Sequence, residues 1–312
     1  MRPINFFKIL IAISILSVCI SFQGCINDDL SVCGVNLQFT YTRNLDGVDK
    51  FSESVERVDV FVFDSEGVYQ DVYSHENIGS IKSMNINLSP GIYSFVVWGN
   101  LCDDYTLSQF VRGETRMNDA ILKLTRVSDT ITTHPGHLFH GAIFNEAVLP
   151  ADQNNQTLTI DMIKDTKSIT VTAVGLPVDP TKASTDIFAC SITSVNGDYK
   201  FDNTITGYDR LHYIPYASVN ADKELISDFI TMRELNDGST DSRLILRHNN
   251  STTGEIKDLF NQSLVELLLP ASVRGDLDIE DTFNIILEFD YVVGTVTVTV
   301  NGWTSGSTSG IL

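Results

Sequence analysis

Hydrophobic and polar residues alternate along most of this chain. Residues 35–41 place Val35, Leu37, Phe39 and Tyr41 at every second position, which is the period of a β-strand with one buried face. The same alternation, bounded by turn residues, predicts six further strands before residue 163, at 58–63, 68–73, 84–88, 92–98, 138–144 and 156–162. Roughly seven strands are enough for a small β-sandwich.

A second series of strands begins at residues 169–175, which resemble residues 35–41 in placement and alternation. The later strands of this series are predicted at 188–193, 211–213, 226–232, 244–246, 283–292 and 295–303. The last two form a hairpin that turns at Val293-Gly294, with valines alternating with threonines along its second strand. We therefore expect an all-β protein with two β-sandwich domains in series, at residues 35–164 and 165–312.

Two short segments have the spacing of a helix. Ile256, Leu259, Phe260, Leu264 and Leu267 fall on one face at a period of 3.6, and Pro270 would end this helix. A second short helix is predicted at residues 118–124, with Asn118 as its N-cap.

The first 24 residues have the pattern of an export signal. Arg2 and Lys8 precede an apolar run at residues 9–20, which is too short for a membrane-spanning helix. Gly24 precedes Cys25, as in a bacterial lipobox, so we expect cleavage before Cys25 and lipidation of its thiol. Ordinary cleavage with Cys25 merely nearby is the alternative. Residues 25–34 would then form a tether from the acyl chains, which bind membranes through their buried methylenes.

Composition and charge exclude several classes of protein. Hydrophobic residues make up 43% of the chain and charged residues 20%, which is ordinary for a protein that folds in water. The formal net charge is -19, so the surface would repel nucleic acid. We expect no nucleic-acid partner.

Three cysteines remain after Cys25 in an oxidising compartment, so one thiol is free or pairs outside the chain. Cys33 precedes the first strand and Cys102 follows the strand that ends at Trp98, which makes Cys33–Cys102 a candidate disulfide. Free buried thiols are the alternative.

The sequence offers little sign of catalysis or metal binding. His134, His137 and His140 are spaced by three, which puts successive side chains on opposite faces of a strand, so we interpret them as loop and edge residues. Residues 276–281 alternate acids like a calcium loop but lack its glycine and terminal glutamate, so we interpret them as a solvated turn. Trp98 and Trp303 are assigned to the core, and residues 306–310 to a flexible tail. We expect no enzyme activity, no metal and no cofactor.

Several segments resemble the FimB/Mfa-type fimbrial anchor lipoproteins of the Bacteroidales, which belong with the type V fimbrial proteins. The matching segments are residues 25–33 (CINDDLSVC), 60–67 (VFVFDSEG), 88–100 (LSPGIYSFVVWGN), 138–141 (LFHG), 281–289 and 301–303. The resemblance implies two transthyretin-like β-sandwich domains and a position at the base of a surface fimbrium. An anchor there attaches the fibre to the outer membrane and ends subunit addition.

The resemblance also implies partners that exchange β-strands. In shaft subunits of this family a protease removes the first strand after an arginine, and a strand from the neighbouring subunit fills the groove. Here residues 35–41 follow the lipidated Cys25 closely, and cutting after Arg43 would remove the lipid. We therefore expect the first strand to stay in place. The candidate for the strand donated to a partner subunit is residues 295–303 with the tail to Leu312. A tip adhesin, or a surface lipoprotein that binds glycan or host protein, is the alternative function.

Overall fold

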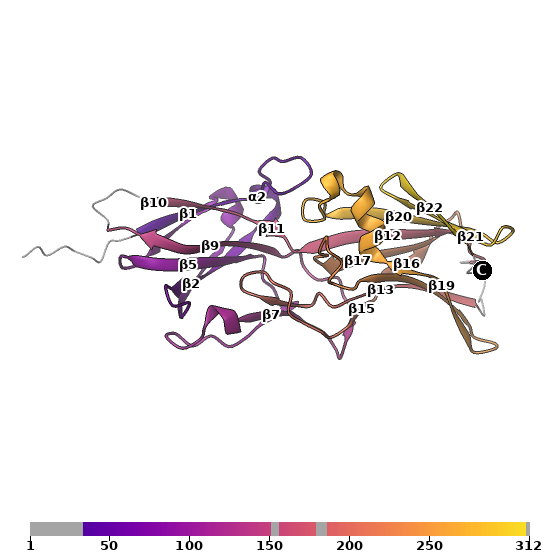
Figure 1. Ribbon diagram of the computed structural model, residues 1–312, viewed down its shortest axis with the longest axis horizontal. Helices are drawn as coiled ribbons and strands as arrows, with labels where there is room; N and C mark the ends of the chain where they lie inside the picture. Colours follow the sequence, from indigo (N-terminus) through magenta and orange to yellow (C-terminus); the bar gives the residue numbers. More distant parts are fainter. Residues whose placement is uncertain (1–33, 151–155, 179–185, 310–312) are drawn as a thin grey trace, which may run out of the picture.

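A computed structural model describes residues 34–150, 156–178 and 186–309 of the chain. Five β-sheets and short helices make up this part, and the two sandwiches that they form follow one another along the long axis of the molecule (Figure 1). The all-β sandwich fold is therefore confirmed. Each strand predicted from the alternation has a counterpart in the structure.

The N-terminal sandwich packs a three-stranded sheet on a five-stranded sheet. The smaller sheet has the order β10 (Gln156–Asp161), β1 (Gly34–Thr40) and β4 (Ser83–Asn87). The larger sheet has the order β11 (Ile163–Lys164), β9 (Phe139–Val148), β5 (Gly91–Gly99), β2 (Arg57–Asp64) and β3 (Tyr69–Glu76). The apolar cluster between them draws only on residues 35–162.

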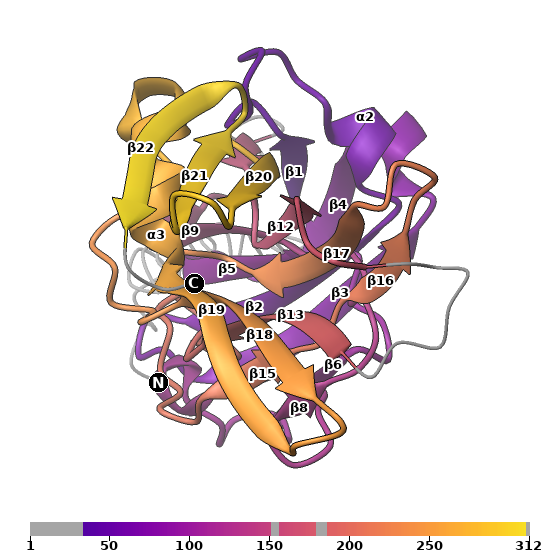
Figure 2. The same ribbon diagram turned by 90° about the vertical axis from the view of Figure 1, so that its right-hand side faces the viewer.

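The C-terminal sandwich packs a six-stranded sheet on a second five-stranded sheet (Figure 2). The six strands are β16 (Tyr216–Val219), β17 (Leu225–Met232), β12 (Thr166–Val174), β20 (Thr282–Asp290), β21 (Thr295–Val300) and β22 (Trp303–Ser309). The five strands are β19 (Glu255–Ser263), β18 (Arg243–Asn250), β13 (Asp186–Ser194), β15 (Leu211–Tyr213) and β8 (Thr130–Ile131).

The two sandwiches repeat one arrangement of strands. In the first, β1 lies between an antiparallel neighbour, β4, and a parallel neighbour, β10. In the second, β12 lies between an antiparallel neighbour, β17, and a parallel neighbour, β20. The resemblance between residues 35–41 and 169–175 in the sequence therefore reflects equivalent central strands.

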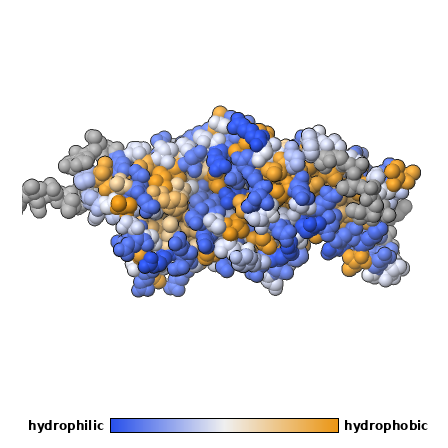
Figure 3. Space-filling model, in the orientation of Figure 1, coloured by the Kyte–Doolittle hydropathy of each residue, from blue (hydrophilic) through white to orange (hydrophobic). Residues whose placement is uncertain are grey.

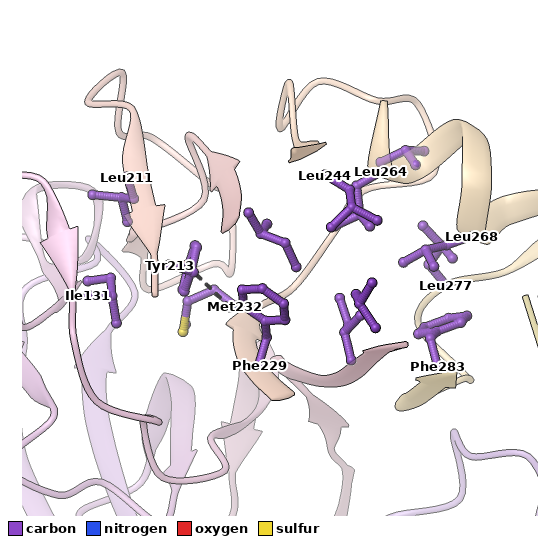
Figure 4. Packing of buried hydrophobic residues seen from close by; sticks show 14 of the residues in the cluster. Ile131, Leu211, Tyr213, Phe229, Met232, Leu244, Leu264, Leu268, Leu277 and Phe283 are labelled. Atoms are coloured by element: carbon purple, nitrogen blue, oxygen red, sulfur yellow. Dashed lines mark hydrogen bonds between the residues drawn. The ribbon is translucent and has the colours of Figure 1, made fainter. Parts of the chain in front are cut away.

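Strands from early in the chain also join the C-terminal half. A fifth sheet has the order β14 (Asp198–Lys200), β7 (Ile121–Leu124) and β6 (Tyr105–Leu107), and β8 pairs with β15. The second apolar cluster accordingly runs from Phe61 to Val300, through both halves of the chain. Figure 4 shows Ile131 close to Leu211 in this cluster. We propose that the chain has two cores, divided near residue 165. Residues 105–131 cross this division, because they precede residue 165 in the sequence but pair with strands that follow it.

The helix predicted from Ile256 onward is wrong for most of its length. The chain forms β19 as far as Ser263, and only α3 (Leu264–Leu268) is helical. A register shift opposite Leu246 and Arg247 interrupts the alternation of β19, so Leu259 and Phe260, although adjacent, are both buried. Two adjacent buried residues imitate the spacing of a helix. Ile256, which was assigned to the same buried face, is 63% exposed. Pairing with β18 therefore overrides the local pattern.

The helix predicted at residues 118–124 is also wrong. A single 3-10 turn, η3 (Met117–Asp119), precedes the strand β7, and Asn118 caps nothing because it lies inside this turn. The other helical elements are short as well: α2 (Phe51–Ser54), η2 (Ile78–Ser80), η5 (Leu269–Ala271) and η6 (Val273–Gly275).

The last hairpin is followed by one strand more than the alternation predicted. The turn before Thr295 is present, with Gly294 at φ 74°. The following strand ends at Val300, however, and a second turn at Asn301 and Gly302 leads into β22, which pairs with β21. The tail assigned as flexible is therefore a strand as far as Ser309, and residues 310–312 lie outside the described part.

Candidate assembly site

The first strand occupies the centre of its sheet. β1 pairs with β10 in parallel from Val35↔Gln156 to Thr40↔Asp161, and with β4 in antiparallel from Gly34↔Asn87 to Gln38↔Ser83. Both edges of β1 are therefore paired with strands of the same chain. Removing β1 would leave a slot between β4 and β10.

The apolar face of β1 fills the interior of the N-terminal sandwich. Val35, Leu37 and Phe39 are 0% exposed, and the ring of Phe39 stacks on Phe51 of α2 at 5.7 Å. Fully burying side chains of this size stabilises the fold by about 1.5–3 kcal/mol each. The alternating side chain of Gln38 points to solvent. The strand thus has one strongly preferred register.

The chain leaves β1 through a loop with many internal hydrogen bonds. The carboxylate of Asp49 accepts from the backbone N–H groups of Tyr41 and Phe51, and the side-chain amide of buried Asn44 donates to the carbonyls of Tyr41 and Val48. These bonds fix the end of the first strand.

Arg43 lies in the same loop and is paired with acids late in the sequence. Its guanidinium donates to Asp278 at 3.3 Å and lies 3.7 Å from Asp276. Arg43, the arginine nearest the end of the first strand, therefore contacts the segment that was interpreted as a solvated turn.

That interpretation of residues 276–281 is wrong. Leu277 is 0% exposed and Glu280 is 4% exposed, because the segment packs against the junction of the two sandwiches. Asp281 accepts a hydrogen bond from the hydroxyl of Tyr41 at 2.6 Å and lies 3.6 Å from the ammonium of Lys167. The acids are therefore partners of cations and of a phenol from other parts of the chain.

The junction also buries charged groups of its own. Lys167 is 0% exposed and donates to the carbonyl of Glu280 at 2.9 Å. Asp165 is 0% exposed and accepts from Asn203 at 3.1 Å, while Arg233 lies 3.6 Å from it. We call these residues, with Tyr41 and Asp281, the junction cluster.

Burial shifts the acid–base properties of this cluster. Desolvation raises the pKa of Asp165 to about 6, although Arg233 opposes the shift, and it lowers the pKa of Lys167, although Asp281 opposes it. The pKa of Tyr41 is raised by burial and by the charge of Asp281. The cluster was missed because only one sequence signal marks it, the charged residues Asp165 and Lys167 at the start of a strand that otherwise carries no charge.

The three closely spaced histidines have separate partners. His134 contacts the carbonyl of Asp228 at 2.8 Å, His137 contacts the hydroxyl of Thr166 at 3.1 Å, and His140 contacts the carbonyl of Phe201 at 3.1 Å. His140 is 6% exposed and packs on Trp98, so its assignment as a loop or edge residue is wrong. Burial lowers the pKa of His140 to about 4. No group of His, Cys, Asp and Glu with metal-site geometry occurs among the described residues.

The far end of the C-terminal sandwich presents the edge strand β22. β21, which was expected to be the donor, lies inside the sheet between β20 and β22. Trp98 is fully buried as predicted, but Trp303, at the start of β22, is 44% exposed, so its assignment to the core is wrong. Within the segment expected as the donor, the strand at a sheet edge is therefore β22 and not β21.

The predicted lipid site and disulfide fall largely outside the described residues, because Cys25 and Cys33 precede Gly34. The Cys33–Cys102 disulfide therefore stays a prediction. Within the described part of the chain the Cys102 thiol has no disulfide partner, and burial raises its pKa.

One hollow on the surface is partly aromatic. It has a volume of about 450 Å³ and lies between β2, β3 and the segment around β6, with Phe61, Tyr69, Tyr105 and Phe110 among its lining residues. The polar floor is the ion pair of Arg57 with Asp59. Within the described ranges, no helix is long and apolar enough to cross a membrane.

Comparison with known proteins gives consistent results. Residues 30–307 match the model of a family described as fimbrillin-A associated anchor proteins Mfa1 and Mfa2. The minor fimbrium anchoring subunit Mfa2 of Porphyromonas gingivalis is 24% identical over 81% of this chain and 79% of its own. The major fimbrium anchoring subunit FimB of the same species is 26% identical over 52% of this chain and 54% of its own.

A solved structure is similar as well. The fimbrial anchor protein Mfa2 from P. gingivalis superposes with a TM-score of 0.72 at 20% identity, over 88% of this chain and 99% of that one. At this identity the similarity demonstrates a common fold.

Proposed function

The chain belongs to the family of fimbrillin-A associated anchor proteins, and from this membership we propose that it is the lipid-anchored base subunit of a surface fimbrium. Cys25 would carry the acyl chains, and the outer membrane would be the site of attachment. The subunit would end fibre growth because its own first strand occupies the slot that a partner strand needs.

The observation that carries the proposal is the position of β1. A sheet that lacks its central strand would expose two rows of unpaired backbone groups, and a strand from a neighbouring subunit would satisfy them. Here Val35, Leu37 and Phe39 fill that position completely. An added subunit would therefore find no acceptor slot behind this one.

The short connection to the membrane supports retention of the strand. Cys25 lies nine residues before Gly34, so any cut that frees β1 also separates the rest of the protein from its lipid. Arg43 is paired with Asp276 and Asp278, which reduces its access to a protease.

Contact with the shaft would use the opposite end of the molecule. β22 is the edge of its sheet and leaves one row of backbone groups without a strand neighbour. We propose β22 and the tail to Leu312 as the segment exchanged with a shaft subunit, in place of residues 295–303.

The alternative function, binding of glycan by an adhesin, receives less support. Glycan recognition commonly uses open aromatic faces, but Phe61, Tyr69 and Tyr105 in the aromatic hollow are 4%, 7% and 7% exposed. On the face shown in Figure 3, hydrophobic residues form small groups among hydrophilic ones. The anchoring role therefore explains more of the structure.

Deletion of the gene and release of the strand test the proposal. Without the subunit, fibres should be longer and should be shed into the medium. A variant with a protease site in the loop after β1, within residues 42–48, and a second membrane tether at another surface loop should let growth continue past it after cleavage, while the uncleaved variant should stop growth normally. Fibres of normal length and attachment in the deletion strain would refute the anchoring role.

A further inference from the structure

A nearly continuous stretch of strand runs through both sandwiches. β10, β11 and β12 follow one another from Gln156 to Val174 along the long axis (Figure 1). At about 3.3 Å per residue, this stretch is about 60 Å long. We call it the axial run.

The axial run leads from the edge neighbour of β1 in the N-terminal half to a central strand of the C-terminal half. Its first part, β10, pairs with β1, and its last part, β12, is central in the six-stranded sheet between β17 and β20. Thr166 and Lys167, where it crosses the junction, are 0% exposed. Few residues separate its strands, so it has little slack.

The first strand enters this arrangement from the outer end of the molecule. Gly34 pairs with Asn87, level with the start of β5, while the ring of Tyr41 lies against Phe139, level with the end of β5. β1 therefore points from the outer end toward the junction, parallel to β10.

The last strand leaves from the other outer end. Ser309 pairs with Thr295, and Thr295 pairs with Asp290, which lies beyond Val174 on the side away from the junction. Gly34 and Ser309, the first and last described residues, thus lie at opposite ends of the long axis, and each terminal strand runs along that axis.

We propose that β1 and the axial run form a force-bearing path for a fibre under tension. Tension between the N-terminal lipid and a partner at β22 would slide β1 along β10 and β4, and would not peel it away. In sliding, the hydrogen bonds along both edges of β1 resist together, over six residue pairs with β10 and five with β4. The covalent axial run then transmits the force directly into β12.

The junction cluster reinforces this path where it changes sandwich. Lys167 of the axial run is bonded to the carbonyl of Glu280, and Tyr41, just after β1, is bonded to Asp281. Both contacts lead into β20, the parallel neighbour of β12. Force on β1 is thereby shared with a second strand of the C-terminal sheet.

This inference rests on the proposed anchoring role, but it can be tested separately from it. The chain from residue 26 to 312 is stretched in a single-molecule force experiment by tags at its two ends. A second preparation carries its second tag in the turn at Ser89 and Pro90, beside the Gly34 end of β1, so that pulling opens the β1–β4 pair from one end. Because bonds then break one after another, we expect the rupture force to fall roughly twofold or more.

Two substitutions identify the strand that resists. Gln38→Pro removes one backbone donor from an exposed position of β1 and should lower the first rupture force between the chain ends. Lys257→Pro, at an exposed position of the edge strand β19, should leave that force unchanged. The comparison of pulling directions keeps residue 38 unchanged, so the test stands if Gln38→Pro fails to fold.

Equal rupture forces in the two directions, or a first rupture insensitive to Gln38→Pro in a folded variant, would overturn the inference. Neither measurement involves lipid or fibres. Failure of the anchoring role would instead appear as normal fibres in the deletion strain, so the two failures are distinguishable.

Discussion

The hydroxyl of Tyr41 donates a 2.6 Å hydrogen bond to the carboxylate of Asp281, 240 residues later in the sequence. Tyr41 follows the first strand of the N-terminal sandwich, and Asp281 precedes β20 of the C-terminal one. This bond therefore connects the first strand of the N-terminal sandwich to the sheet that presents β22.

Tyr41→Phe should destabilise the protein by about 1–2 kcal/mol, because Asp281 loses a charge-assisted donor in a partly buried site. The change removes a single oxygen atom, so packing against Phe139 remains. Denaturant titration measures the loss. Tyr208→Phe serves as the control, since Tyr208 is 95% exposed, and an equal effect of both variants would contradict the role given to Tyr41.

Asp281→Asn should cost more, about 2–4 kcal/mol, because it leaves buried Lys167 without its nearest carboxylate. Lys164, 3.7 Å from Asp281, loses the same partner. Thermal or chemical unfolding gives the difference from the wild type. Asp222→Asn, at an exposed loop position, should be nearly neutral, and stability unchanged in Asp281→Asn would refute a structural role for the junction cluster.

Glu234→Gln should remove part of the pH dependence of stability. Burial raises the pKa of Glu234 to about 7 from its ordinary 4.5, although Ser242 and Thr240 donate to it. The folded protein therefore binds a proton that the unfolded chain releases between these values, and stability falls as the pH rises from about 4.5 to 7. Relative to Glu234→Gln, the wild type should lose on the order of 2–3 kcal/mol across this window.

The measurement is the free energy of unfolding of both proteins at pH 5 and pH 8. Asp165 contributes in the same direction, because its pKa is raised to about 6. His140 contributes in the opposite direction, because its pKa is lowered to about 4 and its protonation destabilises the fold. Both groups are present in both proteins, so the difference isolates Glu234. A difference that does not change with pH would contradict the prediction.

The strands were predictable because most of them have one buried face. In β1, and in β12 from Lys167 onward, buried side chains alternate with more exposed ones, so period two is visible in the sequence. β19 was not predictable, because the register shift beside Leu246 makes adjacent Leu259 and Phe260 both buried. The short strands β6, β7 and β14 have three or four residues each, too few to display a period.

The first strand, β1, was predicted from the sequence, but the side-chain contacts that hold its junction end were not. Asp281 and Lys167 look like ordinary surface charges in the sequence, and only tertiary contact makes them partners. Residues 276–281 were misread for the same reason, because the partners Arg43 and Tyr41 lie more than 230 residues earlier. Local patterns carry no information about such pairs.

Removing residues 303–312 should leave a folded, lipidated protein that no longer retains fibres. β22 pairs only with β21, so its loss exposes one new sheet edge at a cost of about 1–3 kcal/mol. Circular dichroism and membrane fractionation check folding and attachment, and electron microscopy of cells checks the fibres. Unchanged fibre retention would rule out β22 as the contact with the shaft.

Cys25→Ala should move the protein from the membrane fraction to the soluble fraction, because the lipid would be lost. Radiolabelled fatty acid should be incorporated by the wild type and not by the variant. Cys102→Ala is a matched control, since that thiol has no disulfide partner within the described part of the chain and should not affect attachment. A membrane-bound Cys25→Ala protein, together with an unlabelled wild type, would refute lipidation.

A pair of neighbouring substitutions tests whether the first strand closes the slot. Leu37 is 0% exposed and Gln38 is exposed, so Leu37→Asp buries an unpaired charge while Gln38→Asp leaves its charge in water. The buried charge should cost several kcal/mol, on the order of 3–5 kcal/mol, and should loosen β1 from β4 and β10. Hydrogen exchange at residues 34–40 should therefore rise in Leu37→Asp and stay low in Gln38→Asp. If β1 is what ends growth, cells with Leu37→Asp should carry longer fibres, and cells with Gln38→Asp should carry fibres of normal length. A loosened strand with fibres of unchanged length would mean that growth ends by another mechanism.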